Sequence, residues 1–494
     1  MRGWSWLLGL FVAVVLGAVW WTSRNAIRME PLDAQRFAQM SETEQVEWLI
    51  EQILARSKRT DTLTMLREKI PFLQSAQVSR PLTATDVDVI AAACVEYDLM
   101  HWLKLCEPYV ELESNRERLR MYPAVLQARR GNWQAAEQIA QRIGTDATRS
   151  LAWAHLGRLR AEAGQAEAAQ RYFMQAHSLL SQLTTWKEVF EILTTLSLLA
   201  EYSHFGDDAE LLMRTVHRFP PNLQEAAVCR ISDAYRQRGS VEQLRRLVAL
   251  APRGTRVAVR AKLAHALIEQ GHVDEGLKTL VRTKYCPTEQ IVPIIHSIYQ
   301  KGHRDEAQTL AQQLHRTLER DLRRSLPSWR QSSDAWLETP YGWVVVPADF
   351  TKQRLVLTLL VSMYAAWGQD ARAEQLMNAS PDDASSWHSL HIRYCLALAY
   401  HKIGKRNHAR RQLEQVSAEL QHLPPPALDV VVAVVAAKDE MGDAYVLTGD
   451  YRLLFEIAER RLAPTAQRDG LVAILRGLVC RRQPPWRQLL ETGL

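Results

Sequence analysis

Apolar and small residues recur every three or four positions through most of the chain, and glycines interrupt this pattern at regular distances. In residues 151–180 the spacing is present on both sides of Gly164, which predicts two amphipathic helices joined by a tight turn. Gly157 and Ala169 are small, so the two backbones can approach closely there, and Phe173 is expected to fill the space towards the next pair. Gly164 stands where the first helix should end, a position whose left-handed backbone favours glycine. The segment is therefore predicted to form a helical hairpin.

Similar hairpins are predicted along most of the chain. Glycines in comparable surroundings are Gly131, Gly164, Gly206, Gly239, Gly271, Gly302, Gly368, Gly404 and Gly449. Five of the eight intervals between them measure 31 to 36 residues. Five positions after most of these glycines a small residue recurs, at Ala136, Ala169, Gly276, Ala307, Ala373 and Ala409. A chain of 494 residues rarely builds one globular core, whereas stacked helix pairs contact only their neighbours.

One hairpin carries the fullest set of marker residues: Trp153, Leu156, Gly157, Gly164, Ala169, Phe173 and Ala176. This set resembles the signature of the tetratricopeptide repeat (TPR) superfamily, and tyrosines precede four of the turn glycines by four positions. The resemblance covers residues 120–315 and 350–462, although the copy around Gly206 lacks most markers. It implies an all-α fold, a right-handed superhelical solenoid of TPR-like helix pairs, which binds other proteins along its surface.

The N-terminus contains an uncharged apolar run, Trp4–Trp21. As a helix its eighteen residues span about 27 Å, close to the hydrocarbon thickness of a bilayer, and tryptophans stand at both ends. We therefore expect one N-terminal transmembrane helix and a single-pass protein of the bacterial inner membrane. A cleaved signal peptide is the alternative, although the small residues of its cleavage site are poorly matched. Arg2 precedes the run and Arg24 and Arg28 follow it, so a periplasmic location for the remainder is only slightly favoured over a cytoplasmic one.

The pattern divides the chain into five parts. These are a transmembrane anchor (1–24), a juxtamembrane linker with a divergent helical cap (25–120), a TPR-like array (121–315), an insertion containing aromatic residues and proline (316–350), and a C-terminal array with a basic tail (351–494). Ser41 with Glu44, and Thr85 with Asp88, are read as helix starts within the cap. In the insertion Pro340-Tyr341-Gly342 predicts a turn and Trp343–Val346 a short extended piece. The insertion either contacts a partner or packs on itself.

The composition and motifs indicate no catalytic, metal-binding, nucleotide-binding or nucleic-acid-binding site. Formal net charge is +6, and Arg2, Arg24 and Arg28 supply three of these charges, so the remainder is nearly balanced and a nucleic-acid partner is not expected. The six cysteines form no C-x-x-C pair. Nucleotide-binding loops, H-E-x-x-H and G-x-S-x-G are absent from the sequence. His388-x-x-His391, with His401 and His408 farther along, is read as surface histidine, so no metal, cofactor, small-molecule substrate or enzymatic activity is expected.

Candidate binding residues follow from the TPR resemblance, which places the groove positions six and three residues before the turn glycine. Those positions are occupied by Arg158, Asp233, Arg236, His265, His296, Tyr299 and His401, and the aromatic insertion adds Trp329, Trp336 and Trp343. The resulting hypothesis is a non-enzymatic, membrane-anchored scaffold or adaptor in envelope assembly, secretion or a membrane complex. An exported chaperone-like or cargo-binding protein with a cleaved leader is the alternative. A less favoured one is an enzyme or metal protein that uses residues 316–350.

Overall fold

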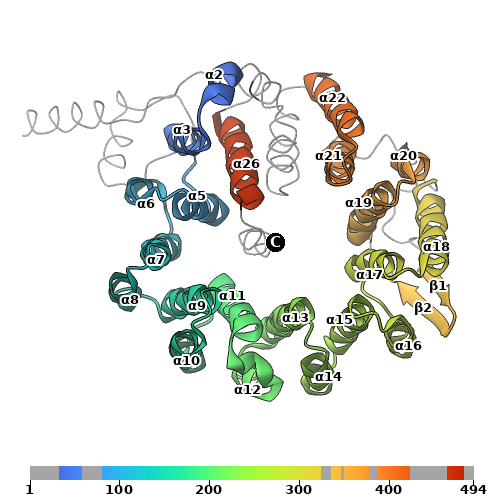
Figure 1. The fold of residues 1–494 in the computed structure, drawn as a ribbon, viewed down its shortest axis with the longest axis horizontal. Helices are drawn as coiled ribbons and strands as arrows, with labels where there is room; N and C mark the ends of the chain where they lie inside the picture. The colour runs from blue at the N-terminus through green and yellow to red at the C-terminus, as the bar shows by residue number, and fades with distance from the viewer. Residues whose placement is uncertain are drawn as a thin grey trace, which may run out of the picture.

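The chain is all-α apart from one hairpin of strands. The computed structural model describes residues 33–57, 80–323, 335–346, 350–378, 387–422, 455 and 464–482. Within these residues the helices follow one another around a wide arc, and the only named strands are β1 and β2 (Figure 1). The predicted all-α class is confirmed at this level.

The helices of the arc form two concentric layers (Figure 1). Along the chain, each helix of the inner layer is followed by a helix of the outer layer. The inner helices are α5 (Ala84–Glu96), α7 (Glu113–Arg129), α9 (Asp146–Glu162), α11 (Val189–Tyr202), α13 (Pro221–Arg238), α15 (Arg256–Glu269), α17 (Thr288–Gln300), α19 (Phe350–Ala366) and α21 (Trp387–Lys402). The outer helices are α6 (Met100–Cys106), α8 (Trp133–Gln141), α10 (Ala166–Gln182), α12 (Ala209–Val216), α14 (Val241–Leu250), α16 (Val273–Thr283), α18 (Arg304–Arg323), α20 (Asp370–Asn378) and α22 (Arg406–His422). Every inner helix contacts the next inner helix, so side chains of one layer run continuously around the arc.

The turn glycines end the inner helices as predicted, with one exception. Seven have a left-handed backbone, namely Gly131, Gly164, Gly239, Gly271, Gly302, Gly368 and Gly404. At Gly164 the amide of Gln165 donates to the carbonyl of Arg160 and the amide of Gly164 to that of Ala161, which satisfies two carbonyls at the helix end. Gly206 is different: it lies in the 3₁₀ helix η3 (His204–Asp207), and a Cβ there would stand 2.1 Å from the carbonyl oxygen of Ala200. Its prediction as a turn glycine was wrong, and Gly449 lies outside the described residues.

Close packing within a pair explains the small residues. A Cβ on Gly157 would stand 2.8 Å from the Phe173 ring, so this aromatic side chain already fills the space beside α9. Phe173 also belongs to the buried apolar cluster that continues into α11 and α13. The Ser41–Glu44 capping box is present at the start of α3 (Glu42–Ala55). The second predicted start was wrong by two residues, because Thr83 and not Thr85 caps α5.

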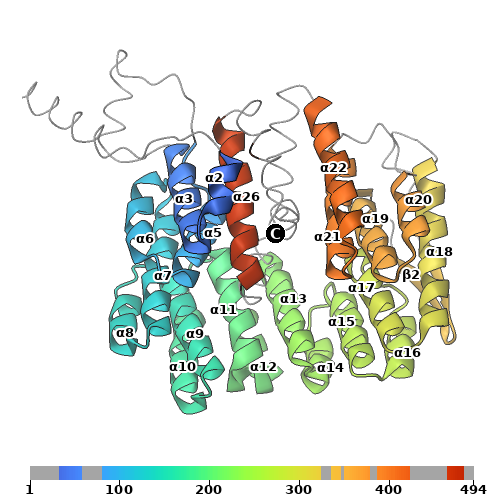
Figure 2. The same ribbon diagram turned by 45° about the horizontal axis from the view of Figure 1, so that its top comes forward.

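The two ends of the described chain meet. Helix α26 (Pro464–Arg482) packs against α3 and α5, beside α2 (Ala34–Gln39), and Figures 1 and 2 show it next to these N-terminal helices. The largest buried apolar cluster joins residues of α3, α5, α7 and α26 and also contains residues of α21 and α22. Arg56 donates to the Gln467 side chain at 2.9 Å, and Arg80 forms an ion pair with Asp469 at 2.7 Å. Contacts between residues about 400 positions apart in sequence therefore join the two ends of the described chain, and this contact is called the closure below.

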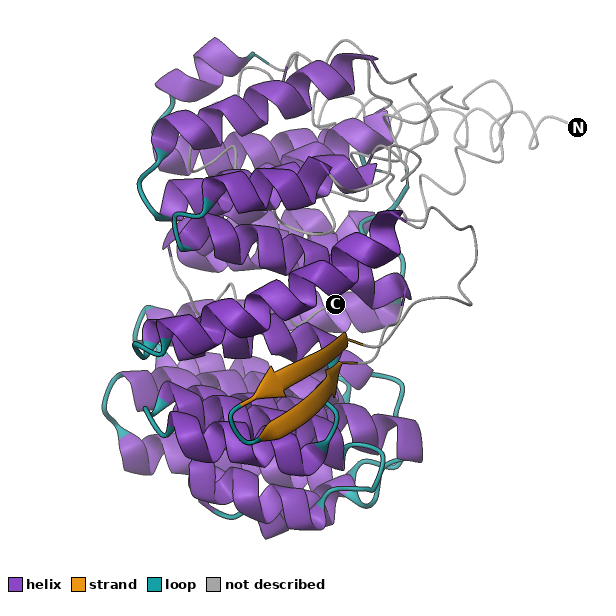
Figure 3. Cartoon of the chain, turned by 90° about the vertical axis from the view of Figure 1, so that its right-hand side faces the viewer, coloured by secondary structure: helices purple, strands orange, loops and turns teal. Residues whose placement is uncertain are grey.

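The predicted insertion contains the sheet. β1 (Ala335–Thr339) and β2 (Gly342–Val346) pair antiparallel, and the hairpin lies across the outer helices (Figure 3). Helix α18 continues to Arg323, past position 316, where the insertion was predicted to begin.

Within the described residues, no helix combines the length and the apolar character needed to cross a bilayer. Trp4–Trp21 lies outside the described residues.

Candidate functional site

Five of the predicted binding residues lie on neighbouring inner helices. On α13, Asp233 forms an ion pair with Lys262 of α15, with 2.7 Å between Oδ2 and Nζ. One turn farther along, the Arg236 guanidinium contacts both carboxylate oxygens of Glu269, at 2.9 and 3.1 Å. Two ion pairs thus connect the same two helices.

His265 continues this set of contacts from α15 to α17. Its Nε2 lies 2.9 Å from the Ser297 hydroxyl oxygen and 3.5 Å from a carboxylate oxygen of Glu269. Burial, together with the charges of Arg236 and His296, lowers the pKa of His265 to about 3. The imidazole is therefore neutral at physiological pH and acts as a hydrogen-bonding group.

An aromatic group ends the row. The Trp367 indole N–H donates to Nδ1 of His296 at 3.1 Å, so that nitrogen is the unprotonated one and His296 is neutral. Burial lowers the pKa of His296, in agreement with this assignment. The Tyr299 ring stacks on Trp367 with 4.2 Å between centroids, and the Arg304 guanidinium lies 5.4 Å from the Tyr299 centroid. This end of the row offers flat apolar surfaces beside polar atoms.

These side chains are called the inner row below. It consists of Asp233, Arg236, Lys262, His265, Glu269, His296, Ser297, Tyr299 and Trp367. Its carboxylates are more accessible than its cations: the side chains of Asp233 and Glu269 are 43% and 38% exposed, those of Lys262 and Arg236 only 9% and 23%. The accessible charge is therefore acidic, next to an aromatic pair.

The other predicted residues do not join the row. Arg158 is buried on α9, where its Nε lies 3.6 Å from Glu162, so the expected exposure of this residue was wrong. His265 is buried as well, against the same expectation. His401 lies on α21, and in the described part of the chain no contact connects it to the row. Trp329 lies outside the described residues.

The sequence-based rule missed four members of the row, namely Lys262, Glu269, Ser297 and Trp367. Lys262 stands nine residues before its turn glycine and Trp367 directly before its own, whereas the rule took only the sixth and third positions. A helix-wheel projection of each whole inner helix would have selected Lys262, because it shares a face with His265.

A second charged group is buried and structural. Arg118 of α7 lies between Asp88 of α5 and Glu191 of α11, at 3.0 and 2.7 Å. The Tyr122 hydroxyl donates to Asp88, and the Arg118 guanidinium lies 4.3 Å from the Phe190 centroid. Burial raises the pKa of Asp88 to about 6 despite the nearby arginine. The three charged side chains are almost fully enclosed, so they connect three inner helices and present little surface to a ligand.

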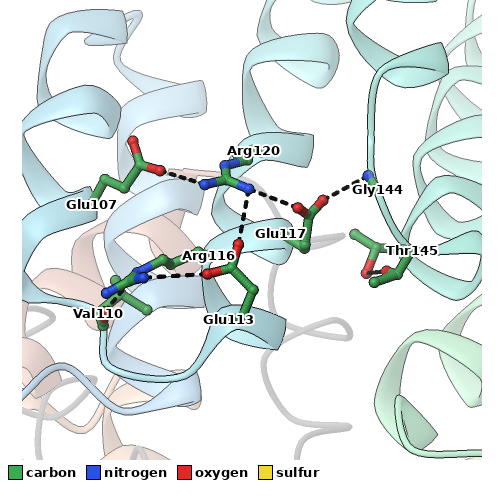
Figure 4. A network of polar contacts seen from close by, with 9 residues as sticks. Glu107, Val110, Glu113, Arg116, Glu117, Arg120, Gly144 and Thr145 are labelled. Carbon is green, nitrogen blue, oxygen red and sulfur yellow. Dashed lines mark hydrogen bonds and ion pairs between the residues drawn. The ribbon is translucent and has the colours of Figure 1, made fainter.

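A third polar group lies at the N-terminal end of α7 (Figure 4). Arg120 contacts Glu107 of the 3₁₀ helix η2 (Glu107–Tyr109), together with Glu113 and Glu117 of its own helix. Glu117 accepts a bond from the Gly144 amide at 2.8 Å, which ties the loop before α9 to α7. The carboxylates of this group are thus already paired with the Arg120 guanidinium or the Gly144 amide of the same chain. The group therefore positions helices and is not a candidate binding site.

The described residues contain no group of three or more histidine, cysteine or acidic side chains able to hold a metal ion. The side chains of His388 and His391 lie outside the description. His408 packs beside the Tyr400 ring, 5.2 Å between centroids.

A scan of protein-family models found no match to this chain, and a search of the curated proteins found none either.

Proposed function

We propose that this chain is a non-enzymatic scaffold or adaptor whose inner row binds a segment of another protein. The supporting observation is the row itself: mixed polar and aromatic side chains from α13, α15 and α17 and from the end of α19 contact one another from helix to helix. Side chains collected from successive helices suit an elongated ligand, because each helix adds contacts along its length. The exposed carboxylates favour a partner segment with basic residues, and the Tyr299–Trp367 pair favours an apolar or aromatic residue beside them.

The finer assignment is part of the same proposal. The helix pairs belong to the TPR type and stack as a right-handed solenoid, and Trp4–Trp21 holds the chain in a membrane. The marker residues around Gly164 and the matching ends of the inner helices support the first part. The length and flanking tryptophans of the N-terminal run support the second. Tethering would raise the local concentration of the scaffold for partners at the same bilayer.

The test is site-specific photo-crosslinking in native membranes. A photoreactive residue at Tyr299 or Gln300 should give a recurrent adduct with one protein, identified by mass spectrometry. The matched control position is Met174, which is exposed on the outer helix α10 and should give none of this adduct. Replacing Asp233 and Glu269 together by Asn and Gln should reduce the adduct without changing thermal unfolding strongly, since both carboxylates are partly solvated. Equal adducts at Tyr299 and Met174 would contradict the proposal.

Membrane attachment needs its own measurement. The intact mass of the mature protein distinguishes a retained anchor from a removed leader, because only the former includes Trp4–Trp21. A mass lacking these residues would support the exported, chaperone-like alternative. It would leave the binding role of the inner row unaffected.

A further inference from the structure

Exposed aromatic side chains gather at the β1–β2 hairpin and at the segment that bridges it. Of the nine exposed large hydrophobic residues there, four are Tyr285, Trp336, Tyr341 and Trp343. Trp336 is 60% exposed, Trp343 51% and Tyr285 50%. Such a concentration of exposed aromatic rings usually marks a site of interaction.

The strand register places three of these rings on one face. Trp336 pairs with Val345 and Glu338 with Trp343, and cross-strand partners project to the same side of a sheet. On the other side of β2, Tyr285 bridges Val345, so Tyr285 and Trp336 flank this buried valine. We call this set, with Tyr285, Trp336, Glu338 and Trp343 as its exposed members, the hairpin face. Tyr341 is held apart at the turn, where Lys278 lies 4.8 Å from its ring centroid.

Strand addition to this small sheet is blocked at both edges. Along β2, the Val345 amide donates to Lys284 and its carbonyl accepts from Cys286, at 2.8 and 2.9 Å. Along β1, the Glu338 amide donates to the Gln313 side chain of α18 at 2.6 Å. A partner must therefore bind the face of the sheet through side chains and cannot extend the ladder of backbone hydrogen bonds.

The charge of the hairpin face distinguishes between the classes of ligand that could bind to the flat side of a sheet. Glu338 is exposed, pairs across the strands with Trp343 and stands two positions from Trp336. Its carboxylate repels phosphate groups, which disfavours single-stranded nucleic acid and anionic lipid.

A polyproline helix fits these features. Diagonal neighbours on adjacent strands, such as Trp336 and Trp343, lie roughly 7–8 Å apart, and one polyproline turn advances about 9 Å, so two rings can contact prolines one turn apart. The carbonyls of such a helix have no internal hydrogen bonds and can accept from indole N–H groups. We propose that the hairpin face binds a proline-rich segment that carries a basic residue opposite Glu338. This role is separate from that of the inner row.

The experiment measures binding of two labelled peptides to the full-length chain in mild detergent. One is a proline-only peptide of about ten residues, roughly 30 Å long as a polyproline helix, and the other carries one central arginine. Both should bind saturably, the arginine peptide more tightly. A serine–glycine peptide carrying the same arginine should not bind. Absence of saturable binding by either proline peptide would overturn the proposal.

Variants separate the face from the rest of the surface. Trp336→Ala and Trp343→Ala should each weaken binding about tenfold, and Trp336→Phe by less because the ring remains. Glu338→Gln should weaken binding of the arginine peptide about threefold and leave the affinity for the proline-only peptide unchanged. Leu112→Ala, at a similarly exposed apolar residue far from the hairpin, is the matched control and should change nothing. Unchanged binding in both tryptophan variants would refute the assignment. So would tryptophan-dependent binding of oligothymidylate or of phosphatidylglycerol vesicles with no binding of the proline peptides.

Discussion

The closure, which joins α26 to the N-terminal helices, should depend on Arg468, the largest fully buried side chain in the described residues. Its guanidinium donates to the carbonyl oxygens of Arg80 and Pro81 at 3.0 and 3.2 Å. It also lies 3.1 Å from Asp469 and 3.6 Å from Asp86. Arg468→Ala removes every one of these contacts and leaves two carbonyls and the Asp86 carboxylate with fewer partners in a site that excludes water.

The expected cost follows from these contacts. Removing one member of a buried ion pair costs about 3–5 kcal/mol, because the remaining charge stays desolvated. Asp469 keeps its 2.7 Å contact with Arg80, so the lower end, about 3 kcal/mol, applies here. The loss should be local, since α26 packs on α3 and α5 while α15 and α16 lie on the far side of the arc (Figure 1).

Hydrogen exchange with mass spectrometry on the full-length chain measures this directly. Amides of α26, α3 and α5 that exchange through opening of the closure should exchange about 100-fold faster in Arg468→Ala, the equivalent of about 3 kcal/mol. Amides of α15 and α16 should keep their rates. Arg410→Ala is the control, because Arg410 is exposed and pairs with Glu414 in its own helix. Unchanged exchange in α26 would refute the importance of Arg468, and equal acceleration in α15 would refute the local character of the closure.

Three further predictions test the packing, the titration and the thiols. Gly157→Val should lower the free energy of unfolding by about 1–3 kcal/mol, because the new Cβ would lie 2.8 Å from the Phe173 ring; unchanged denaturant unfolding would exclude this close packing. The pKa of His265 is about 3 in the folded chain and about 6.5 when unfolded, so its contribution is complete above pH 6.5 and is lost as pH falls towards 3. Wild-type stability should therefore fall between pH 6 and 4 more steeply than that of His265→Gln, by up to about 1.4 kcal/mol per pH unit, and parallel curves would contradict the assignment. Burial raises the pKa of the Cys106 thiol to about 12, so iodoacetamide should modify the partly exposed Cys229 before Cys106, and equal rates would show that Cys106 is accessible.

Local features of the chain were predictable because their causes are local. A helix end that needs a left-handed residue selects glycine from the backbone alone, and seven of the predicted turn glycines have this conformation. Gly206 failed for a reason that no local pattern contains: its neighbour in space is the Ala200 carbonyl, and close approach, not a turn, excludes a side chain. The shift of a cap from Thr85 to Thr83 has a local cause, since Thr83 and Asp86 form a capping box of their own: the Asp86 amide donates to the Thr83 hydroxyl and the Thr83 amide to the Asp86 carboxylate.

By itself, the sequence determined the all-α class and the positions of most inner-helix ends, because periodicity and turn chemistry act within a few residues. Only the tertiary structure decided which charges meet. The Asp233–Lys262 and Arg236–Glu269 pairs connect two helices, and the Arg56–Gln467 contact connects the two ends of the chain. Such contacts depend on how successive helices are rotated and stacked, which is set by the sum of many packing interactions and not by any single segment.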